Sequence, residues 1–384
     1  MPDSIIKQVR SQIPVTKLRP PSTQETIVRD SLISQLREGL DSHRLLLLSA
    51  PAGSGKTTLA ADFVRTAEEC TIRWLTLDAG DNDTTIFLLA FVVAIGLQPD
   101  TGILDSIMQG HMASRQVANV LINMLDMDND QPFVLVLDDL HLVTNTEIYE
   151  FLDYFIDHVP THFHLLITTR YDPPLSLTRW RTRGELMEIR LNHLRFQRAE
   201  VSVFLNQVLQ LNIPDELIGQ MVDRTEGWIA GLRLLAFSLE RVDAAQREQY
   251  ITNLAERDRY VFDLLAEEVL SQQPEAMQKF LLQTAILDAL TPQLCIAVTQ
   301  QPDAADKLRE LHRHNLFLVS LGDGTYRYHA LFQNFLQTFL KYDQPTLLKT
   351  LHLRAADSHS MPYRKIHHYL AAEAWEPAIA LVSQ

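Results

Sequence analysis

The stretch that decides the fold of the first half of the chain is LLLLSAPAGSGKTTLA, residues 45–60. Its segment APAGSGKT fits the P-loop pattern, with Ala50 at the position where glycine is commoner. An apolar run precedes the loop and a helical pattern follows it. In that context backbone N–H groups and the start of the helix cradle phosphate oxygens, and Gly53 and Gly55 permit the necessary bend. The stretch therefore predicts a phosphate site between a buried strand and a helix.

The side chains of this loop predict how a nucleotide would be held. Lys56 is expected to reach the β- and γ-phosphate oxygens, and the Thr57 hydroxyl is expected to bind Mg²⁺. A chance loop of glycine and serine is the alternative, which the flanking strand and helix patterns disfavour. The loop residues predicted to bind the nucleotide are Ala52, Gly53, Ser54, Gly55, Lys56, Thr57 and Thr58.

Two further strand ends supply groups that the loop lacks. FVLVLDDLH, residues 133–141, places Asp138 where it would hold Mg²⁺ through water and Asp139 where a hydrolytic base or water-positioning group belongs. The strand in HLLITTRYDPP ends at Thr168–Thr169–Arg170, and the guanidinium fork of Arg170 can bind γ-phosphate oxygens. A solvated turn and a surface arginine are the plainer alternatives. The predicted catalytic residues are Lys56, Asp138, Asp139 and Arg170, and the predicted Mg²⁺ ligands are Thr57 and Asp138.

The first half alternates strand-like runs with helical patterns, which is typical of a parallel sheet covered by helices. Together with the motifs, this predicts an α/β P-loop NTPase fold of the type with an additional strand. The expected strands are Leu45–Ser49, Ile72–Leu77, Phe133–Leu137, His164–Thr168 and Leu186–Leu191. The expected helices are Thr57–Ala67, Thr84–Ile95, Ser114–Leu125 and Glu147–His158.

The second half is predicted to be mainly helical. Apolar residues recur at spacings of three and four in residues 198–209, 214–225 and 227–240, and again in residues 260–270 and 275–287. A short hairpin pattern turns at Gly322–Gly324, and helices followed by a small hairpin are the plan of a winged helix. The expected domains are a nucleotide-binding domain (1–192), a helical domain (193–255), a winged-helix domain (256–345) and the start of a helical-repeat arm (346–384). The apolar run before the last residues indicates a longer array of which this chain is a fragment.

The amino-acid composition limits the classes of function and of cellular location that are expected. The formal net charge is −14, so the chain as a whole does not attract nucleic acid. The predicted winged helix, residues 256–343, has eight Lys/Arg and twelve Asp/Glu, a net charge of −4, which favours a regulatory role over DNA binding. Two cysteines suggest a reducing compartment, and no apolar run approaches the ~18 residues of a membrane helix. A cytoplasmic protein without membrane or DNA contact is expected.

The ordered series of motifs resembles the STAND class of signal-transduction ATPases, and within it the large LuxR-type transcriptional regulators of the MalT-like kind. The likeness covers nearly the whole chain. Besides the P-loop and VLVLDDLH, it is carried by IPVTKLRPP, WLTLDAGDND, LLITTR, LRFQRAEVSVFL, TEGWIAGLRLLAFSL, FLLQTAILDALTPQLC, YRYHALFQNFL and IHHYLAAEAWEPAIALV.

The resemblance implies a mechanism. Buried ADP keeps such a protein closed and monomeric, an inducer on the sensor arm and ATP open it and let it self-associate, and slow hydrolysis resets it. By motif, Ile27, Val28 and Arg29 would line the adenine and ribose, and His329 would approach the β-phosphate from the winged helix. One departure is Ile229, which stands where the class has a proline that packs on adenine. The DNA-binding domain and most of the arm, which would recognise the unknown inducer, lie outside this sequence.

Three functions remain to be separated. A nucleotide-gated switch, working as a slow ATPase, predicts tightly held ADP and weak turnover. A motor or remodelling ATPase of the AAA+ type needs robust turnover and an arginine finger, for which only Arg179, Arg181 and Arg183 offer themselves. A kinase needs an acceptor pocket and a lid, and the helical and winged modules of the second half make it the least favoured.

Overall fold

The computed structural model describes residues 10, 13–22, 26–67, 69–97, 101–126, 131–240, 242, 246–252, 265, 269–313, 316–359 and 362–382. The chain forms two compact units. The first contains residues 1–50 and 54–194, and the second contains residues 51–53 and 195–384. The first three residues after Ala50 thus belong with the second half of the chain, although they lie within the P-loop.

The first unit is built on one parallel sheet of five strands. They are β1 (Leu45–Ser49), β2 (Thr71–Thr76), β3 (Phe133–Asp138), β4 (Phe163–Thr169) and β5 (Leu186–Arg190). Their order is β2-β3-β4-β1-β5, so β4 lies between the strand that precedes the P-loop and the strand that ends in Asp138. This confirms the predicted α/β fold with an additional strand.

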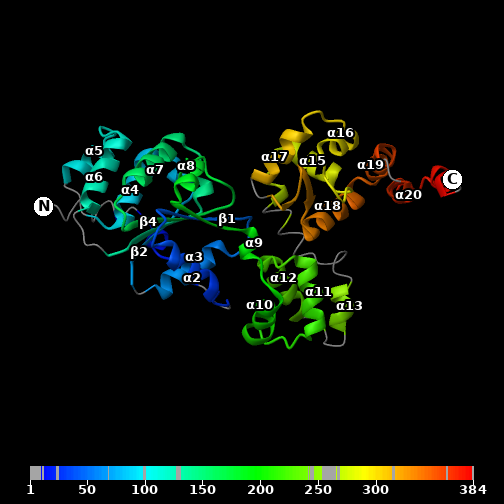
Figure 1. The fold of residues 1–384 in the computed structure, drawn as a ribbon, viewed down its shortest axis with the longest axis horizontal. Helices are drawn as coiled ribbons and strands as arrows, with labels where there is room; N and C mark the ends of the chain where they lie inside the picture. The colour runs from blue at the N-terminus through cyan, green and yellow to red at the C-terminus, as the bar shows by residue number, and fades with distance from the viewer. Residues whose placement is uncertain are drawn as a thin grey trace. The chain divides into compact units, whose positions relative to one another are not determined.

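The two faces of the sheet are covered by different helices (Figure 1). Leu45 and Leu47 of β1 point to one face, and Leu46 and Leu48 point to the other, because side chains alternate along a strand. All four are fully buried, as is usual for a parallel sheet covered on both sides. One face packs on α4 (Thr84–Ile95), α5 (Thr101–Met108), α6 (Ser114–Asp126), α7 (Thr146–His158) and α8 (Leu177–Arg183), and the other on α2 (Asp30–Gly39) and α3 (Lys56–Thr66).

Short segments complete this unit. They are η1 (Val15–Leu18), η2 (Ala79–Asn82), η3 (Leu140–Leu142) and α9 (Leu191–Leu194). The sequence analysis did not predict α2, α5 or α8. Helices α5 and α8 span only eight and seven residues, which is about two turns and too short for a clear period of apolar residues.

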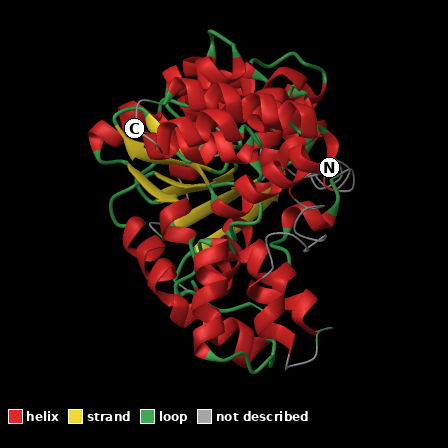
Figure 2. Ribbon diagram, turned by 90° about the vertical axis from the view of Figure 1, so that its right-hand side faces the viewer, coloured by secondary structure: helices red, strands yellow, loops and turns green. Residues whose placement is uncertain are grey.

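The second unit is mostly helical (Figure 2). Among its described residues the only strands are β6 (Leu318–Gly322) and β7 (Thr325–Tyr328), which pair antiparallel around the predicted turn. The predicted helix over residues 260–270 falls largely outside the described residues. The helices, with the π-helix η4, are α10 (Arg198–Ser202), η4 (Val203–Val208), α11 (Asp215–Thr225), α12 (Ile229–Glu240), α13 (Arg247–Thr252), α15 (Glu275–Thr284), α16 (Pro292–Thr299), α17 (Ala304–Arg313), α18 (Ala330–Asp343), α19 (Pro345–Ser358), α20 (Pro362–Ala371) and α21 (Trp375–Val382).

A turn at Gly227 sets where α12 begins. Gly227 has φ +70°, and a Cβ atom there would lie 2.4 Å from the Phe196 carbonyl oxygen, so only glycine fits. The Phe196 N–H also donates to the Gly227 carbonyl at 2.9 Å. The apolar pattern predicted a helix from residue 227, but this turn delays its start to Ile229. Trp228 is therefore held just outside the first turn of the helix.

Candidate functional site

The predicted phosphate-binding groups follow adjacent strands at one edge of the sheet. The P-loop follows β1, Asp138 ends β3, and Arg170 comes directly after β4. Because the carboxyl ends of parallel strands share one edge, the topology brings these segments together. The crevice outside these strand ends is where ligands bind in open α/β sheets.

The P-loop has the form of an anion cradle. Gly53 and Gly55 have φ values of +67° and +85°, and helix α3 begins at Lys56. Lys56 is only 6% exposed, and its Nζ donates to the Ala50 carbonyl at 2.8 Å. Burial lowers the pKa of Lys56 to about 8, although Asp139 and Asp138 favour its charge. Among the described residues, the buried Ser54 hydroxyl has no hydrogen-bond partner. A buried cation and an unsatisfied hydroxyl beside glycine turns fit a phosphate group.

Asp138 is held by two hydroxyl groups. Thr57 Oγ1 donates to Asp138 Oδ1 at 2.8 Å, and Thr168 Oγ1 donates to the same oxygen at 2.6 Å. Burial raises the pKa of Asp138, and these hydrogen bonds oppose the rise. The two predicted Mg²⁺ ligands, Thr57 and Asp138, are thus in direct contact. The described residues include no group of three or more His, Cys, Asp or Glu side chains suited to a metal, so these oxygen donors would need water and phosphate to complete a Mg²⁺ shell.

Asp139 lies beside this pair in a left-handed conformation, with φ 61°. Its N–H donates to Thr168 Oγ1 at 3.0 Å, and its side chain is 38% exposed. Burial raises the pKa of Asp139, while Lys56 and Arg170 oppose this rise, so both cations lie near its carboxylate. The structure thus brings all four predicted catalytic residues into one electrostatic cluster.

His141 stays neutral next to this cluster. Its Nδ1 lies 3.7 Å from Asp139 Oδ1, and burial lowers its pKa to about 3, with Arg170 and Lys56 adding to the effect. The His141 carbonyl accepts a hydrogen bond from the Tyr171 hydroxyl at 2.9 Å. Such a buried neutral imidazole is suited to packing the loop after β3 rather than to carrying charge.

The sequence analysis missed the role of Thr168. Its hydroxyl both donates to Asp138 and accepts from the Asp139 N–H, so it fixes the two acidic residues at once. Strand register was the available signal, because Leu137 pairs with Ile167 and the next residues of the two strands are therefore neighbours.

The residues predicted to line adenine and ribose precede α2. Val28 is 48% exposed, and Ile27 and Arg29 are partly exposed. The Arg29 guanidinium donates to the carbonyls of Leu194 (2.8 Å) and His193 (3.3 Å) at the end of α9. The segment is thereby tied to the last residues of the first unit. Its contact with a base remains a prediction.

His329 lies in the second unit, at the start of α18, and is 2% exposed. Its Nε2 is 3.9 Å from Glu226 Oε2, and within the described residues its Nδ1 has no hydrogen-bond partner. Burial lowers the pKa of His329 to about 4, while Glu226 opposes this. Glu226 itself accepts from Arg327 at 2.7 and 3.2 Å and from the Ala330 N–H at 3.0 Å. His329 is therefore a neutral donor or acceptor in a charged surrounding.

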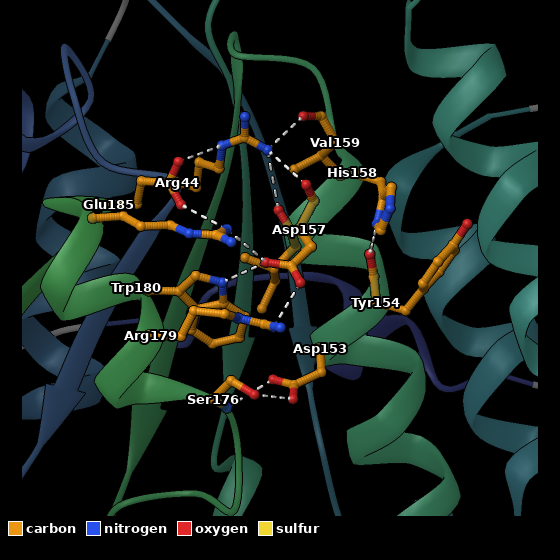
Figure 3. Close-up of polar contacts among 12 residues, drawn as sticks. Arg44, Asp153, Tyr154, Asp157, His158, Val159, Ser176, Arg179, Trp180 and Glu185 are labelled. Atoms are coloured by element: carbon orange, nitrogen blue, oxygen red, sulfur yellow. Dashed lines mark hydrogen bonds and ion pairs between the residues drawn. The ribbon is translucent and has the colours of Figure 1, made fainter.

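The arginines considered as a possible finger are paired within the first unit. Figure 3 shows Arg179 and the Trp180 indole directed at Asp157. The Arg179 guanidinium lies 2.6 Å from the Asp157 carboxylate, and the Trp180 indole N–H donates to that carboxylate at 2.9 Å. Arg183 lies 3.5 Å from the same carboxylate, and Arg181 forms two hydrogen bonds with Glu188. These contacts favour the interpretation of the segment as a structural feature of α8.

An N-terminal segment forms a cavity beside Asp138. Lys17 bridges Asp81 at 2.7 Å and Asp78 at 2.9 Å, which ties η1 to the segment after β2. The cavity has a volume of about 570 Å³ and is lined by Val15, Thr16, Lys17, Arg19, Pro20, Pro21, Ser22, Thr76 and Asp138. It adjoins the candidate site, and the sequence analysis did not foresee it.

The sequence matches two protein families. Residues 25–168 match the AAA ATPase domain, and residues 266–348 match the MalT winged helix domain. Over the part of the chain that the structure describes, no helix has the length and apolar character needed to cross a membrane.

Individual relatives agree with these matches. The HTH-type transcriptional regulator MalT of Yersinia enterocolitica is 30% identical over 370 residues, and that of Cronobacter sakazakii is 31% identical over 379 residues. Each alignment covers 94% of this chain and 40% of the relative, so the chain spans well under half of their length. A Walker-type ATPase of Pyrococcus abyssi shares the fold with a TM-score of 0.56 and 16% identity, over 83% of this chain and 98% of that one. The chain is therefore a relative of the MalT-type transcriptional regulators, with an AAA ATPase domain followed by a MalT-type winged helix domain.

Proposed function

We propose that this chain is the nucleotide-binding core of a STAND-type regulatory switch that holds ADP in one state and ATP in another. The observation that carries the proposal is the Asp138 carboxylate, which accepts hydrogen bonds from Thr57 of the P-loop and from Thr168 on the intervening strand. This contact joins the phosphate-binding loop to the strand that would support hydrolysis. The similarity to MalT over 94% of the chain supports a regulatory role.

The residues have distinct proposed tasks. Lys56 and the loop N–H groups would hold the phosphates, and Arg170 would lie near the γ-phosphate. Thr57 and Asp138 would hold Mg²⁺, which supplies charge neutralisation at the phosphates when bound. Asp139 would orient water and accept its proton. Its raised pKa makes it a better base than an exposed aspartate.

A slow timer is favoured over a motor. The arginines of α8 are engaged with Asp157 and Glu188 of their own unit, which disfavours a role for them as an arginine finger. His329 is proposed to sense the β-phosphate from the winged helix. We also propose inducer-driven opening, self-association in the ATP state and control of transcription. These properties are proposed from the similarity to the relatives, which are more than twice as long as this chain.

The first experiment identifies the nucleotide that co-purifies with the protein. The protein is denatured and its supernatant analysed by anion exchange. Stoichiometric ADP with turnover well below the ~10 s⁻¹ typical of enzymes supports the switch. Nucleotide-free protein that hydrolyses ATP at tens per second contradicts it.

Two variants then separate binding from hydrolysis. Lys56→Ala should abolish nucleotide binding, because the loop loses its buried cation. Asp139→Ala should leave ATP bound but unhydrolysed, because the groups that hold phosphate and Mg²⁺ are intact. Hydrolysis at the wild-type rate in Asp139→Ala would refute the assignment of that residue.

A further inference from the structure

Two P-loop residues of the second unit, Ala52 and Gly53, accept hydrogen bonds from the start of α12. The Trp228 indole N–H donates to the Ala52 carbonyl at 3.0 Å, and the Ala230 N–H donates to the Gly53 carbonyl at 3.1 Å. The contact is close, since a Cβ atom on Gly53 would lie 2.4 Å from the Ala230 Cβ and 3.1 Å from the indole nitrogen. These two successive carbonyls therefore have fixed directions.

Fixing a carbonyl also fixes the next N–H. The peptide group is planar and trans, so the C=O of one residue and the N–H of the following residue point in opposite directions. The hydrogen bond to the Ala52 carbonyl thus orients the Gly53 N–H, and the bond to the Gly53 carbonyl orients the Ser54 N–H. Both N–H groups are turned away from α12, and both belong to the set that cradles phosphate in a P-loop.

Trp228 is itself supported from the winged helix. It is 3% exposed, and its ring meets Phe317 edge to face, with centroids 5.2 Å apart. Phe317 packs on Phe332 and has φ +50°, which is costly for a phenylalanine. The His329 N–H donates to the Phe317 carbonyl at 2.7 Å and helps to hold this conformation.

We infer that Trp228 is a positioning residue for the nucleotide's phosphates: through Ala52, and together with Ala230, it preorganises the P-loop N–H groups of Gly53 and Ser54. The inference rests on the proposed nucleotide site and adds that phosphate affinity depends on the helical and winged-helix segments. Donors that are already oriented bind more tightly, because less conformational freedom is lost on binding. Recognition of the base and ribose does not draw on these two N–H groups.

The test compares Trp228→Phe with Trp180→Phe in the full chain. Both replacements remove a buried indole hydrogen bond of similar length, but Trp180 donates to Asp157 on α7. Binding of ADP, pyrophosphate and adenosine is measured by titration calorimetry after bound nucleotide has been removed. Trp228→Phe should weaken ADP and pyrophosphate about five- to tenfold and change adenosine less than twofold, as loss of one hydrogen bond allows. Trp180→Phe should leave all three affinities unchanged.

Each other outcome has a defined meaning. Wild-type ADP affinity in Trp228→Phe overturns the inference, and so does an equal loss for adenosine. A wild-type protein that binds no nucleotide overturns the proposed function instead. If Trp228→Phe does not fold, replacement of Trp228 by benzothienylalanine serves, since a sulfur atom takes the place of the indole N–H, so the ring keeps its shape and only the donor to Ala52 is lost. It should weaken ADP and pyrophosphate to the same extent, and an unchanged affinity refutes the inference.

Discussion

Replacement of Glu226 by glutamine should destabilise the second unit. Glu226 follows α11, its side chain is 11% exposed, and it accepts hydrogen bonds from Arg327 and the Ala330 N–H. Burial alone would raise its pKa, but these hydrogen bonds, together with the charge that His329 gains below about pH 4, bring the pKa to about 2, from the ordinary 4.5. At about 1.4 kcal/mol per pKa unit, the ionised carboxylate stabilises the fold by about 3 kcal/mol relative to its neutral form. Glutamine keeps the shape and loses this contribution.

The direction of the Glu226 pKa shift determines how the stability depends on pH. Because the folded-state pKa lies below the unfolded value of 4.5, the stabilisation is fully present above pH 4.5 and is lost as the pH falls toward 2. The wild type and Glu226→Gln should therefore differ by at most about 3 kcal/mol at pH 7, where His329 is neutral, and converge near pH 2. A difference that persists unchanged at pH 2 would show that the carboxylate charge is not its cause.

Hydrogen exchange followed by mass spectrometry locates the effect, which a single unfolding midpoint does not do in a chain with two units. Exchange in Glu226→Gln should rise at the start of α18 and not in the sheet. Glu188→Gln is the matched control, since hydrogen bonds from Arg181 lower the Glu188 pKa to about 2 in the first unit. Glu188→Gln should increase hydrogen exchange in β5 and leave α18 protected from exchange. Unchanged protection of α18 in Glu226→Gln refutes the reasoning.

Three shorter predictions concern the first unit. Thr168→Val removes the hydroxyl that fixes Asp138, so ATP turnover should fall at least tenfold with nucleotide affinity within about threefold, in phosphate-release and titration assays. Lys17→Met leaves the Asp81 carboxylate, whose side chain is 1% exposed, without its ammonium partner, and should cost about 2–4 kcal/mol in urea unfolding at pH 7. Arg179→Ala should leave ATP turnover unchanged at any protein concentration, and a concentration-dependent loss would restore the arginine-finger hypothesis.

The local sequence pattern was sufficient to predict the strands of the sheet. β1 matches its predicted bounds, and β2 to β5 differ by one residue at one or both ends, because buried parallel strands are continuous apolar runs bounded by turn residues. Their order was less accessible, yet the P-loop and the two strand ends already implied that β4 is inserted between β1 and β3. The position of Thr168 beside Asp138 then follows from register alone.

Contacts between distant segments were beyond the sequence. Trp228 is 3% exposed, as a core residue would be, but its hydrogen bond to Ala52 spans 176 positions. Nothing in the spacing of GWIAG indicates which carbonyl an indole will meet. The start of α12 at Ile229 was also missed, because the helical period continues through Gly227 while the approach of Phe196 forbids a helix there.

The assignment of residues 51–53 to the second unit has a consequence for protein engineering and for recombination among relatives. A fragment cut after Leu194 would retain every side chain of the predicted hydrolytic cluster but lose the supports of its own loop. A chimera that exchanges only the helical segment would combine the Trp228 indole of one parent with the P-loop of the other. We expect functional chimeras to take the residues around Ala52 and those around Trp228 from the same parent. The segments that must be exchanged together are therefore discontinuous in the chain.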